Sequence, residues 1–411
     1  MNDARTRGDA RSLLSTAAVR ERCGRLLDAA RGGRSRWFEL DEARLDDAAD
    51  LVAEVTRRRY PTLAVPYHSR WRHFEAGGAD RVAALEAAAG DALADPAARA
   101  RARIDLAVVS VLLDAGAGGA WRYHDRESGT TLSRSEGLGV ASLRAFAAGL
   151  FSSDPRVPLR ADAAGLAALD AARLADAFQA SPTNPLVGVD GRLALLHRLG
   201  AALAERPDVF GRSARPGGLF DTLTVDRATE VRAHDILAAL LDALGPIWPQ
   251  GARIGGVAVG DAWRHPAAGG VGAGAGWVPL HKLSQWLTYS LLEPFESAGL
   301  RVVGLDALTG LAEYRNGGLL VDAGVVVPRD AGAFAAPLPP GAEPIVEWRA
   351  LTVALLDALA PKVRATLGVD AGRMPLAAVL EGGTWAAGRE LARALRGGEP
   401  PFAIASDGTV F

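Results

Sequence analysis

The sequence predicts a mainly α-helical fold that carries a small β element. Most segments place their apolar residues at the three- and four-residue spacing of a helix that buries one face. Strand signals are confined to short runs between residues 300 and 328. Hydrophobic residues make up 49% of the 411-residue chain and charged residues 23%, so there is enough apolar material for a sizeable core.

The first clear helix is predicted from "DEARLDDAADLVAEVTRRRY" at residues 41–60. Asp41 is a candidate N-cap. One face of this helix carries five apolar residues: Leu45, Ala48, Ala49, Val52 and Val55. The same kind of pattern predicts further helices at residues 81–94, 98–116, 141–151, 227–245, 347–368 and 375–395.

Two segments carry strand signals. The run "LRVVGL" at residues 300–305 is short, and "GGLLVDAGVVVP" at residues 317–328 reads as a hairpin whose turn is residues 322–324. No internal repeat or firm domain boundary is visible. Residues 1–411 are therefore expected to form one unit, and a proline-rich stretch at residues 329–344 is the best candidate for a connection between two helical lobes.

Charge and composition exclude several classes of protein. The formal net charge is −2 without a basic stripe, so binding of nucleic acid through phosphate neutralisation is not expected. No run of about 18 apolar residues suggests a membrane span. The charged N-terminal segment lacks the apolar core of a signal peptide, so we expect a cytoplasmic protein. The single cysteine, Cys23, excludes an internal disulfide.

Familiar catalytic and cofactor motifs are missing from the sequence. There is no GxxxxGK[ST] loop, GxSxG elbow or HExxH pair, and the glycine-rich residues 269–276 lack GxGxxG spacing. None of the seven histidines forms a helical pair suited to a metal ion. We expect neither a metal nor an organic cofactor.

A scarce residue type draws attention to "VPLHKLSQWLTYSLLEPFE" at residues 278–296. The chain has 46 lysines and arginines, yet only Lys282 and Lys362 are lysines. On a helix, Lys282 shares a face with Gln285, Trp286 and Tyr289, while leucines cover the other sides. A compact ammonium facing a cavity would explain why lysine is kept here. The alternative is a solvated lysine beside packed aromatic residues.

Glu313, in "LTGLAEYRNGG", is a candidate partner for that lysine. Gly317 and Gly318 are expected to end a helix after Arg315 or Asn316, which would put Glu313 in its last turn. The helix dipole disfavours a carboxylate there. Such an acid needs a function or a cation such as Lys282 or Arg315, although a structural network gives the same pattern.

Two other segments combine aromatic and charged residues. "YPTLAVPYHSRWRHFEAGGADR" at residues 60–81 suits a flat polar ligand or a sugar phosphate, and equally a buried aromatic corner whose arginines reach surface acids. In "WRYHDRESGTTLSRSEGLGVASLRAF", Ser133 or Ser135 is expected to cap a helix with Glu136 in its first turn. Arg134 and the free N–H groups of that helix start could instead hold an anion.

Together these motifs resemble a known family. "RWFELDEARLDDAADLV", "YPTLAVPYHSRWRHF", "RSEGLGVAS", "VPLHKLSQWLTYSLLEPFE" and "LTGLAEYRNGGLLVD" resemble the uracil catabolism protein family of fungi and bacteria, formerly a domain of unknown function, over nearly the whole chain. The uracil pathway of that family opens the pyrimidine ring after ribose has been attached, and urea leaves later. The resemblance implies an enzyme that hydrolyses ribosylurea, or its 5′-phosphate, to urea and ribose or ribose phosphate.

A more distant resemblance bears on the chemistry. Queuosine-nucleotide salvage N-glycosidases carry a "KRAQ"-like helix and an "ADYR" motif about thirty residues later, which "HKLSQ" and "AEYR" resemble. This likeness implies a helical fold related to the helix-hairpin-helix DNA glycosylases, with Lys282 and Glu313 in the site. Glutamate replaces the aspartate of that family, and "RNGG" replaces its "RVPQ".

The two resemblances give each candidate residue a role. Glu313 would stabilise an oxocarbenium-like centre and direct water, and Lys282 would hold ribose or phosphate oxygens. His68 or His73 would assist the leaving urea, Arg70, Arg72 or Arg315 would hold a 5′-phosphate, and Trp71 or Phe74 would pack on the ligand. The full set expected to contact the small-molecule substrate is Tyr67, His68, Arg70, Trp71, His73, Phe74, Glu136, His281, Gln285, Tyr314 and Arg315.

Two other functions stay open. One is an amidohydrolase that acts on the ureido group in the same pathway. The other is a non-catalytic binding protein or sensor for a uracil-derived nucleotide. The sequence gives no sign of the oligomeric state.

Overall fold

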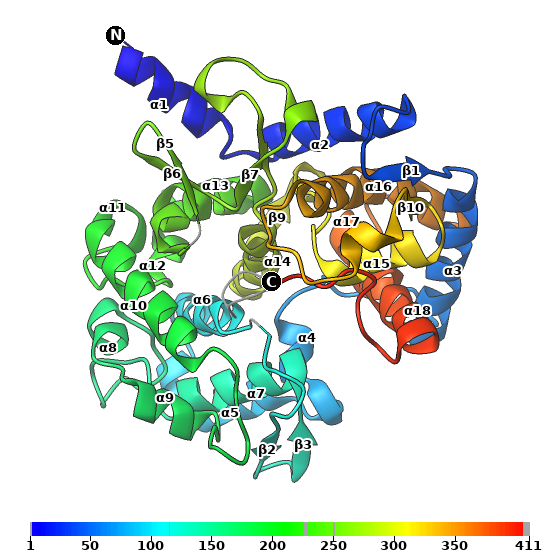
Figure 1. Cartoon of the computed structure of the whole chain (residues 1–411). Helices are drawn as coiled ribbons and strands as arrows, with labels where there is room; N and C mark the ends of the chain where they lie inside the picture. Colours follow the sequence, from blue (N-terminus) through cyan, green and yellow to red (C-terminus); the bar gives the residue numbers. More distant parts are fainter. Residues whose placement is uncertain (1, 115, 226–228, 250, 406–411) are drawn as a thin grey trace. The chain divides into compact units, whose positions relative to one another are not determined.

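The computed structural model describes residues 2–114, 116–225, 229–249 and 251–405, and the chain is mainly α-helical with short strands (Figure 1). This confirms the predicted fold class. The chain divides into two compact units: unit 1 contains Met1–His68, Gln250–Gln285 and Gly304–Ala405, and unit 2 is formed mainly by Ser69–Pro249 and Trp286–Val303. Residues 329–344 lie inside unit 1 rather than at a boundary between units.

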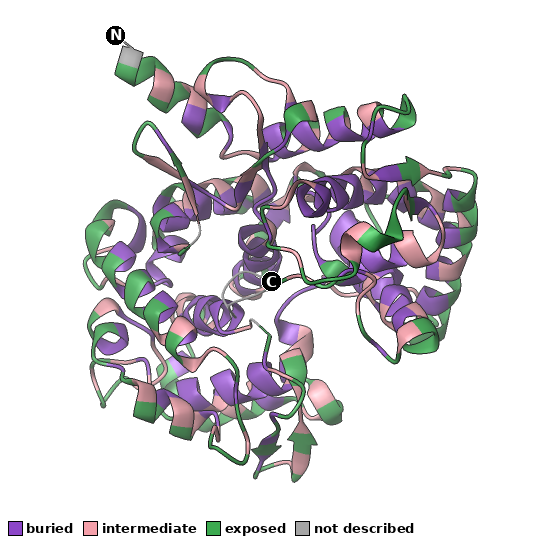
Figure 2. Ribbon diagram, viewed as in Figure 1, coloured by how far each residue is buried: buried purple, intermediate pink, exposed green. Residues whose placement is uncertain are grey.

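Unit 1 is organised by the long helix α16 (Glu343–Leu367), which packs against α2 and α3. Most of α16 is buried (Figure 2). The other α-helices that lie wholly in unit 1 are α1 (Asn2–Ser12), α2 (Thr16–Arg31), α3 (Arg44–Arg59), α15 (Tyr314–Asp322), α17 (Leu376–Val379) and α18 (Trp385–Arg396), and a π-helical turn (Leu380–Thr384) joins the last two.

The short strands of unit 1 form two-stranded sheets that connect its loops. β1 and β10 pair antiparallel, and so do β5 with β6 and β7 with β8. Their bounds are β1 (Phe38–Leu40), β5 (Ala252–Ile254), β6 (Val257–Gly260), β7 (Ala262–Arg264), β8 (Trp277–Pro279) and β10 (Val326–Pro328).

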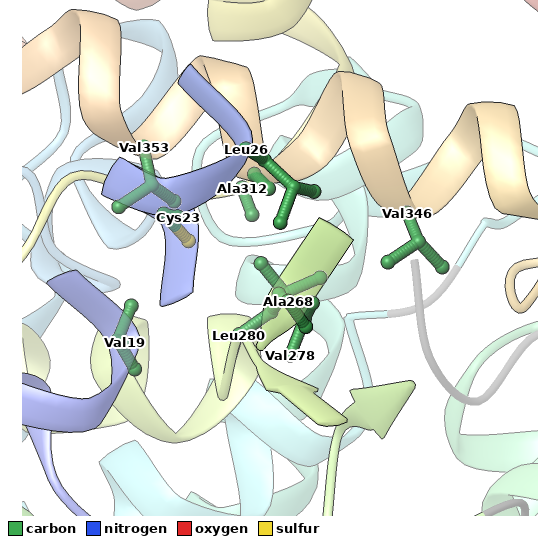
Figure 3. Close-up of a cluster of buried hydrophobic side chains, with 10 residues drawn as sticks. Val19, Cys23, Leu26, Ala268, Val278, Leu280, Ala312, Val346 and Val353 are labelled. Carbon is green, nitrogen blue, oxygen red and sulfur yellow. The ribbon is translucent and has the colours of Figure 1, made fainter. Parts of the chain in front are cut away.

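One buried apolar cluster of unit 1 holds together the segments that carry Lys282 and Glu313 (Figure 3). Leu280 and Ala312 both belong to this cluster. Lys282 comes shortly after Leu280 in the chain and Glu313 directly after Ala312, so one core anchors both segments. The other members come from α2, from the segment before β8, from β8 itself and from α16: Val19, Cys23, Leu26, Ala268, Val278, Val346, Ala350 and Val353.

The hairpin predicted at residues 317–328 is wrong. Its first half is helix α15, and its second half is strand β10, which pairs with β1. Gly317 does not end the helix but lets it approach α16, since a Cβ atom there would lie 2.7 Å from the ring of Trp348. The indole Nε1 of Trp348 donates a hydrogen bond to the Gly317 carbonyl at 3.1 Å. Gly317 therefore serves close packing of α15 on α16.

Unit 2 contains α4, α6, α10 and the greater part of α14, with α6 packed on α7 and α10 packed on α8. Strands β2 and β3 pair antiparallel, and β4 and β9 pair parallel. The bounds are α4 (Trp71–Phe74), α5 (Arg81–Ala89), α6 (Pro96–Leu112), β2 (Tyr123–Asp125), β3 (Thr130–Leu132), α7 (Arg134–Ala147), α8 (Ala163–Ala167), α9 (Ala171–Ala177), α10 (Val189–Glu205), α11 (Pro207–Phe210), α12 (Gly218–Leu223), β4 (Glu230–Arg232), α13 (Ala233–Leu244), α14 (Lys282–Ser297) and β9 (Arg301–Val303).

The predicted helices are largely present. The five apolar residues expected on one face of α3 are all buried. Asp41 does not cap this helix, because the N-cap is Ala43 and no side chain caps it. Part of the helix predicted at residues 227–245 is instead strand β4. Residues 227–228 of that prediction, and residue 115 of the helix predicted at 98–116, lie outside the described residues. Among the helices of the described residues, none is sufficiently long and apolar to span a membrane.

The close packing of α15 on α18 yields a stability prediction. A Cβ atom at Gly388 would lie 2.1 Å from the backbone carbonyl oxygen of Arg315, whereas Gly24 on α2 has no such neighbour within 4 Å. We expect Gly388→Ala to lower the free energy of unfolding by about 1–3 kcal/mol. Gly24→Ala should raise it by about 0.5–1 kcal/mol. Urea unfolding of both variants would measure this, and an equal effect of the two substitutions would contradict the packing.

Candidate functional site

The side chain of Glu313 caps the N-terminus of α15. Oε2 accepts a hydrogen bond from the backbone N–H of Arg315 at 2.7 Å, and Oε1 accepts one from that of Asn316 at 2.6 Å. The prediction that Glu313 lies in the last turn of a helix is wrong, because the helix begins directly after it. The helix dipole therefore stabilises this carboxylate. Each oxygen keeps a further lone pair for another contact.

The surroundings of Glu313 shift its pKa in opposite directions. The residue is 8% exposed. Burial raises the pKa of Glu313, because the charged form loses hydration, while the backbone N–H donors and the positive charges of Lys282 and His68 act to lower it. The pKa is raised on balance. Lys282 and His68, both named from the sequence, therefore lie within electrostatic reach of Glu313.

A buried ion pair fixes the backbone at Lys282. The carboxylate of Asp261 accepts hydrogen bonds from Nη1 and Nη2 of Arg349 at 2.9 and 2.8 Å, and its Oδ2 also accepts the backbone N–H of Lys282 at 3.0 Å. Nε of Arg349 donates to the carbonyl of Ala312 at 3.2 Å. One guanidinium thus fixes both the start of α14 and the residue before Glu313.

Gln285 ties the same two segments together a second time. Its Nε2 donates to the hydroxyl of Thr309, and its Oε1 accepts the backbone N–H of Thr309 at 3.3 Å. The Gln285 side chain is fully buried. Both ends of its amide thus position the segment that leads to Glu313, and a direct contact with substrate stays a prediction.

His281 has a structural contact as well. Its Nε2 lies 2.9 Å from the carbonyl oxygen of Leu13, so this nitrogen carries a proton and donates it. Burial lowers the pKa of His281 and favours the neutral ring. The backbone of His281 has φ of 48°, an uncommon conformation for a residue other than glycine, directly before Lys282.

His68 is held by an acid that sequence reasoning missed. Nδ1 of His68 lies 2.9 Å from Oε2 of Glu381, and both side chains are nearly buried. The other oxygen of Glu381 accepts hydrogen bonds from Nη2 of Arg59 at 2.8 Å and from the hydroxyl of Tyr60 at 3.0 Å. Burial alone would raise the pKa of Glu381, but His68 and Arg59 lower it to about 2.

Glu381 lies in the π-helical turn between α17 and α18. Gly382 and Gly383 follow it, and a Cβ atom at Gly383 would lie 2.4 Å from the carbonyl oxygen of Val52 on α3. Such turns within helices are frequent at functional sites. The pair of glycines in "LEGGTW" was the available sequence signal, although the segment reads as part of one long helix.

Three further predicted residues lie in unit 1. Tyr67 directly precedes His68. Tyr314 is the first residue of α15 and is 38% exposed, with the guanidinium of Arg315 at 4.7 Å from its ring centre. Nη1 of Arg315 donates to the carbonyl of Gly398 at 3.0 Å, so this arginine tethers the segment after α18.

The remaining predicted residues belong to unit 2, where Arg70 is buried. Its Nε donates to Ser110 at 2.7 Å, and its Nη1 lies 2.9 Å from a carboxylate oxygen of Asp114. Burial lowers the pKa of Arg70, while Asp114 and, more weakly, Glu136 oppose the shift. Glu136 lies in the first turn of α7, as predicted.

Aromatic residues of unit 2 follow Arg70 in the chain, and one ring contacts its guanidinium. Trp71 and Phe74 pack edge to face, and Nε1 of Trp71 donates to the carbonyl of Ser290 at 2.7 Å. His73 packs against the ring of Trp286, which lies 5.7 Å from the guanidinium carbon of Arg70. These contacts match the aromatic corner that the sequence allowed. A single cavity shared by this group and Glu313 stays a prediction.

Within the described ranges, no three histidine, cysteine, aspartate or glutamate side chains are grouped so that they could hold a metal ion.

The Asp261–Arg349 pair gives a prediction about stability and pH. Burial would raise the pKa of Asp261, but Arg349 lowers it from 3.8 to about 2, so the charged carboxylate stabilises the fold above pH 3.8. Asp261→Asn should cost about 3–5 kcal/mol at neutral pH, since it leaves Arg349 buried without a counter-charge. The difference from the wild type should shrink as the pH falls from about 4 to 2.

Urea unfolding at several pH values would measure this. Asp3→Asn is the control, because Asp3 and its partner Arg7 are both exposed and such pairs contribute little. A deficit for Asp261→Asn that is equal at pH 7 and pH 2 would contradict the linkage.

Comparison with known proteins agrees with the resemblance seen in the sequence. The family described as "Protein of unknown function (DUF1688)" matches residues 12–411. "Uracil catabolism protein 4" of Lachancea kluyveri is 38% identical over 431 residues, which covers 97% of this chain and 98% of the relative. "Protein urg3" of Schizosaccharomyces pombe is 39% identical over 408 residues with the same coverage of both chains. By these matches over nearly its whole length, the chain belongs to the DUF1688 family.

Proposed function

We propose that this protein acts in uracil catabolism as an N-ribosyl hydrolase that cleaves ribosylurea, or its 5′-phosphate, into urea and ribose or ribose phosphate. The name of the Lachancea kluyveri relative supports the pathway. The observation that carries the reaction type is the buried carboxylate of Glu313, held by two backbone N–H groups and flanked by the charges of Lys282 and His68.

The chemistry of N-ribosyl cleavage matches this arrangement. As the bond between C1′ and nitrogen breaks, positive charge develops at C1′ and at the ring oxygen. A fixed carboxylate in a site that excludes water stabilises that charge strongly, because it needs no reorganisation. Glu313 can also accept a proton from the attacking water through its remaining lone pairs. Its raised pKa makes it a better base than an exposed glutamate.

Lys282 would hold an oxygen of the ribose or of its phosphate. The hydrogen bond from its backbone N–H to Asp261 fixes the backbone of Lys282, so its side chain starts from a fixed position. The predicted contacts of Arg70, Arg72 and Arg315 with a 5′-phosphate belong to the phosphorylated form of the substrate. Comparison of ribosylurea with its 5′-phosphate decides whether a phosphate is recognised at all.

The direct test incubates the purified protein with each compound and measures free urea, ribose or ribose phosphate, and ammonia. Urea and the matching sugar product in equal amounts are expected. Ammonia without urea would favour the amidohydrolase, and binding without turnover would favour the sensor.

Glu313→Gln should lower turnover of the preferred substrate by about 100-fold or more and leave its binding nearly unchanged, because the lost charge acts mainly in the transition state. Urea release measures turnover, and calorimetry measures binding. Glu54→Gln is the control, since Glu54 is an exposed residue of α3 in the same unit. Wild-type turnover in Glu313→Gln would remove the proposed role.

The two lysines of the chain give a matched pair of variants. Lys282→Arg keeps the charge but changes its shape and reach, so we expect turnover to fall by about tenfold or more. Lys362→Arg should be silent, because Lys362 is exposed on α16 and pairs with Asp46 at 2.5 Å. If both variants release urea at the wild-type rate, Lys282 has no part in the reaction.

A further inference from the structure

We propose that His68, held by Glu381, is the acid that protonates the departing urea, and that Glu381 is the residue that positions it. This inference rests on the proposed function and assigns one of its steps. Urea anion is a poor leaving group, so the nitrogen that leaves C1′ needs a proton at the moment of bond cleavage.

The hydrogen bond to Glu381 fixes which nitrogen of His68 is available. Nδ1 is committed to Oε2 of Glu381 at 2.9 Å, so Nδ1 carries a proton. When the ring is charged, Nε2 therefore carries the second proton and is the atom that can give it away. A carboxylate behind a histidine fixes ring orientation and tautomer in just this manner in metal sites and triads.

Three side chains hold the carboxylate of Glu381 in place. Arg59 and Tyr60 donate hydrogen bonds to its Oε1, and His68 donates one to Oε2. The pKa of Glu381 is low, so the acid remains ionised throughout the neutral range. This fixed carboxylate holds the His68 ring in one orientation through Nδ1. Glu381 thus acts through His68 rather than on a ligand.

His68 also lies within electrostatic reach of Glu313. Its charge is among those that act on Glu313, and both residues belong to unit 1. An acid and a carboxylate that share a site can serve the two ends of one reaction: the acid at the leaving nitrogen, the carboxylate at C1′ and its attacking water.

A second buried histidine–glutamate pair of unit 1 shows the contrast. Nε2 of His265 lies 3.2 Å from Oε2 of Glu347, but Nδ1 of His265 accepts the backbone N–H of Ala267 at 3.1 Å. Ser35 binds the other oxygen of Glu347. Both ring nitrogens of His265 are therefore engaged within the protein, and this pair has no proton to offer a ligand. In the described part of the chain, His68 has no such second bond.

The step balances as follows. The C1′–N bond breaks, its electron pair goes to the urea nitrogen, and the Nε2 proton of His68 joins that nitrogen. The oxygen of water bonds to C1′, and one water proton passes to Glu313. Solvent then removes the proton from Glu313 and reprotonates His68, so that the net change is the addition of one water.

The test compares two substrates that differ only in the leaving group. Ribosylurea needs a proton on the leaving nitrogen, whereas ribosyl azide releases a small, stable anion that needs none. His68→Asn keeps an N–H donor toward Glu381 but removes Nε2. We expect it to slow urea release by about 100-fold or more and azide release by less than about fivefold. Glu381→Gln should slow urea release by about tenfold, again with little effect on azide.

Three controls separate the possible results. Glu313→Gln should slow both substrates alike, because it acts at C1′. His265→Asn should leave the ratio of the two rates unchanged, and circular dichroism confirms that each variant is folded. If the wild type cleaves neither substrate, the proposed function itself fails. If the wild type cleaves both, and His68→Asn slows both equally, only the role of His68 is overturned. A wild type that cleaves ribosylurea but not the azide would also count against it.

Discussion

The candidate site depends on one buried ion pair, that of Arg349 and Asp261. Arg349 lies on α16 directly before Ala350, a member of the buried apolar cluster that also contains Leu280 and Ala312, so packing sets its position. From there its guanidinium contacts both Asp261, which holds the backbone of Lys282, and the carbonyl of Ala312, which precedes Glu313. Lys282 and Glu313 are 31 positions apart in the chain (313 − 282), and this ion pair joins their segments. A buried pair of this kind stabilises only while both partners are present.

The acidic residues around the candidate site change the stability of the fold with pH in opposite directions. Asp261 and Glu381 have lowered pKa values, so their charges stabilise the fold above the ordinary carboxyl range and are lost in acid. Glu313 has a raised pKa, so the folded chain holds its proton more tightly than the unfolded chain does. Its contribution therefore weakens the fold as the pH rises above about 4.5. The acid proposed to do the chemistry costs stability at neutral pH, and the two acids that position its neighbours offset that cost.

Sequence patterns predicted features set by residues close together in the chain, such as the buried face of a helix. They missed contacts between residues that are far apart in the chain. The buried face of α3 follows from a spacing within one helix. Lys282, Glu313 and His68 stood out by residue type and resemblance, and the structure groups them. The predicted place of Glu313 in the last turn of a helix was wrong, because Gly317, which suggested a helix stop, is instead needed for close contact with Trp348. Glu381, Asp261 and Arg349 could not be found in this way, since His68 and Glu381 are 313 positions apart and Asp261 and Arg349 are 88 apart.

The contacts made by the arginines help to explain why lysine is kept at residue 282. Arg349 binds both oxygens of one carboxylate and a carbonyl, and Arg59 and Arg70 also use several nitrogens of one planar group. These are fixed contacts that suit a rigid fork of donors. An ammonium is a point charge that can follow a ligand oxygen as the reaction proceeds. Lys362 shows that rarity alone assigns no role, because it forms an ordinary surface pair. What distinguishes Lys282 is its place: a backbone fixed by a buried ion pair, directly after a strained histidine, with its charge acting on the buried carboxylate of Glu313.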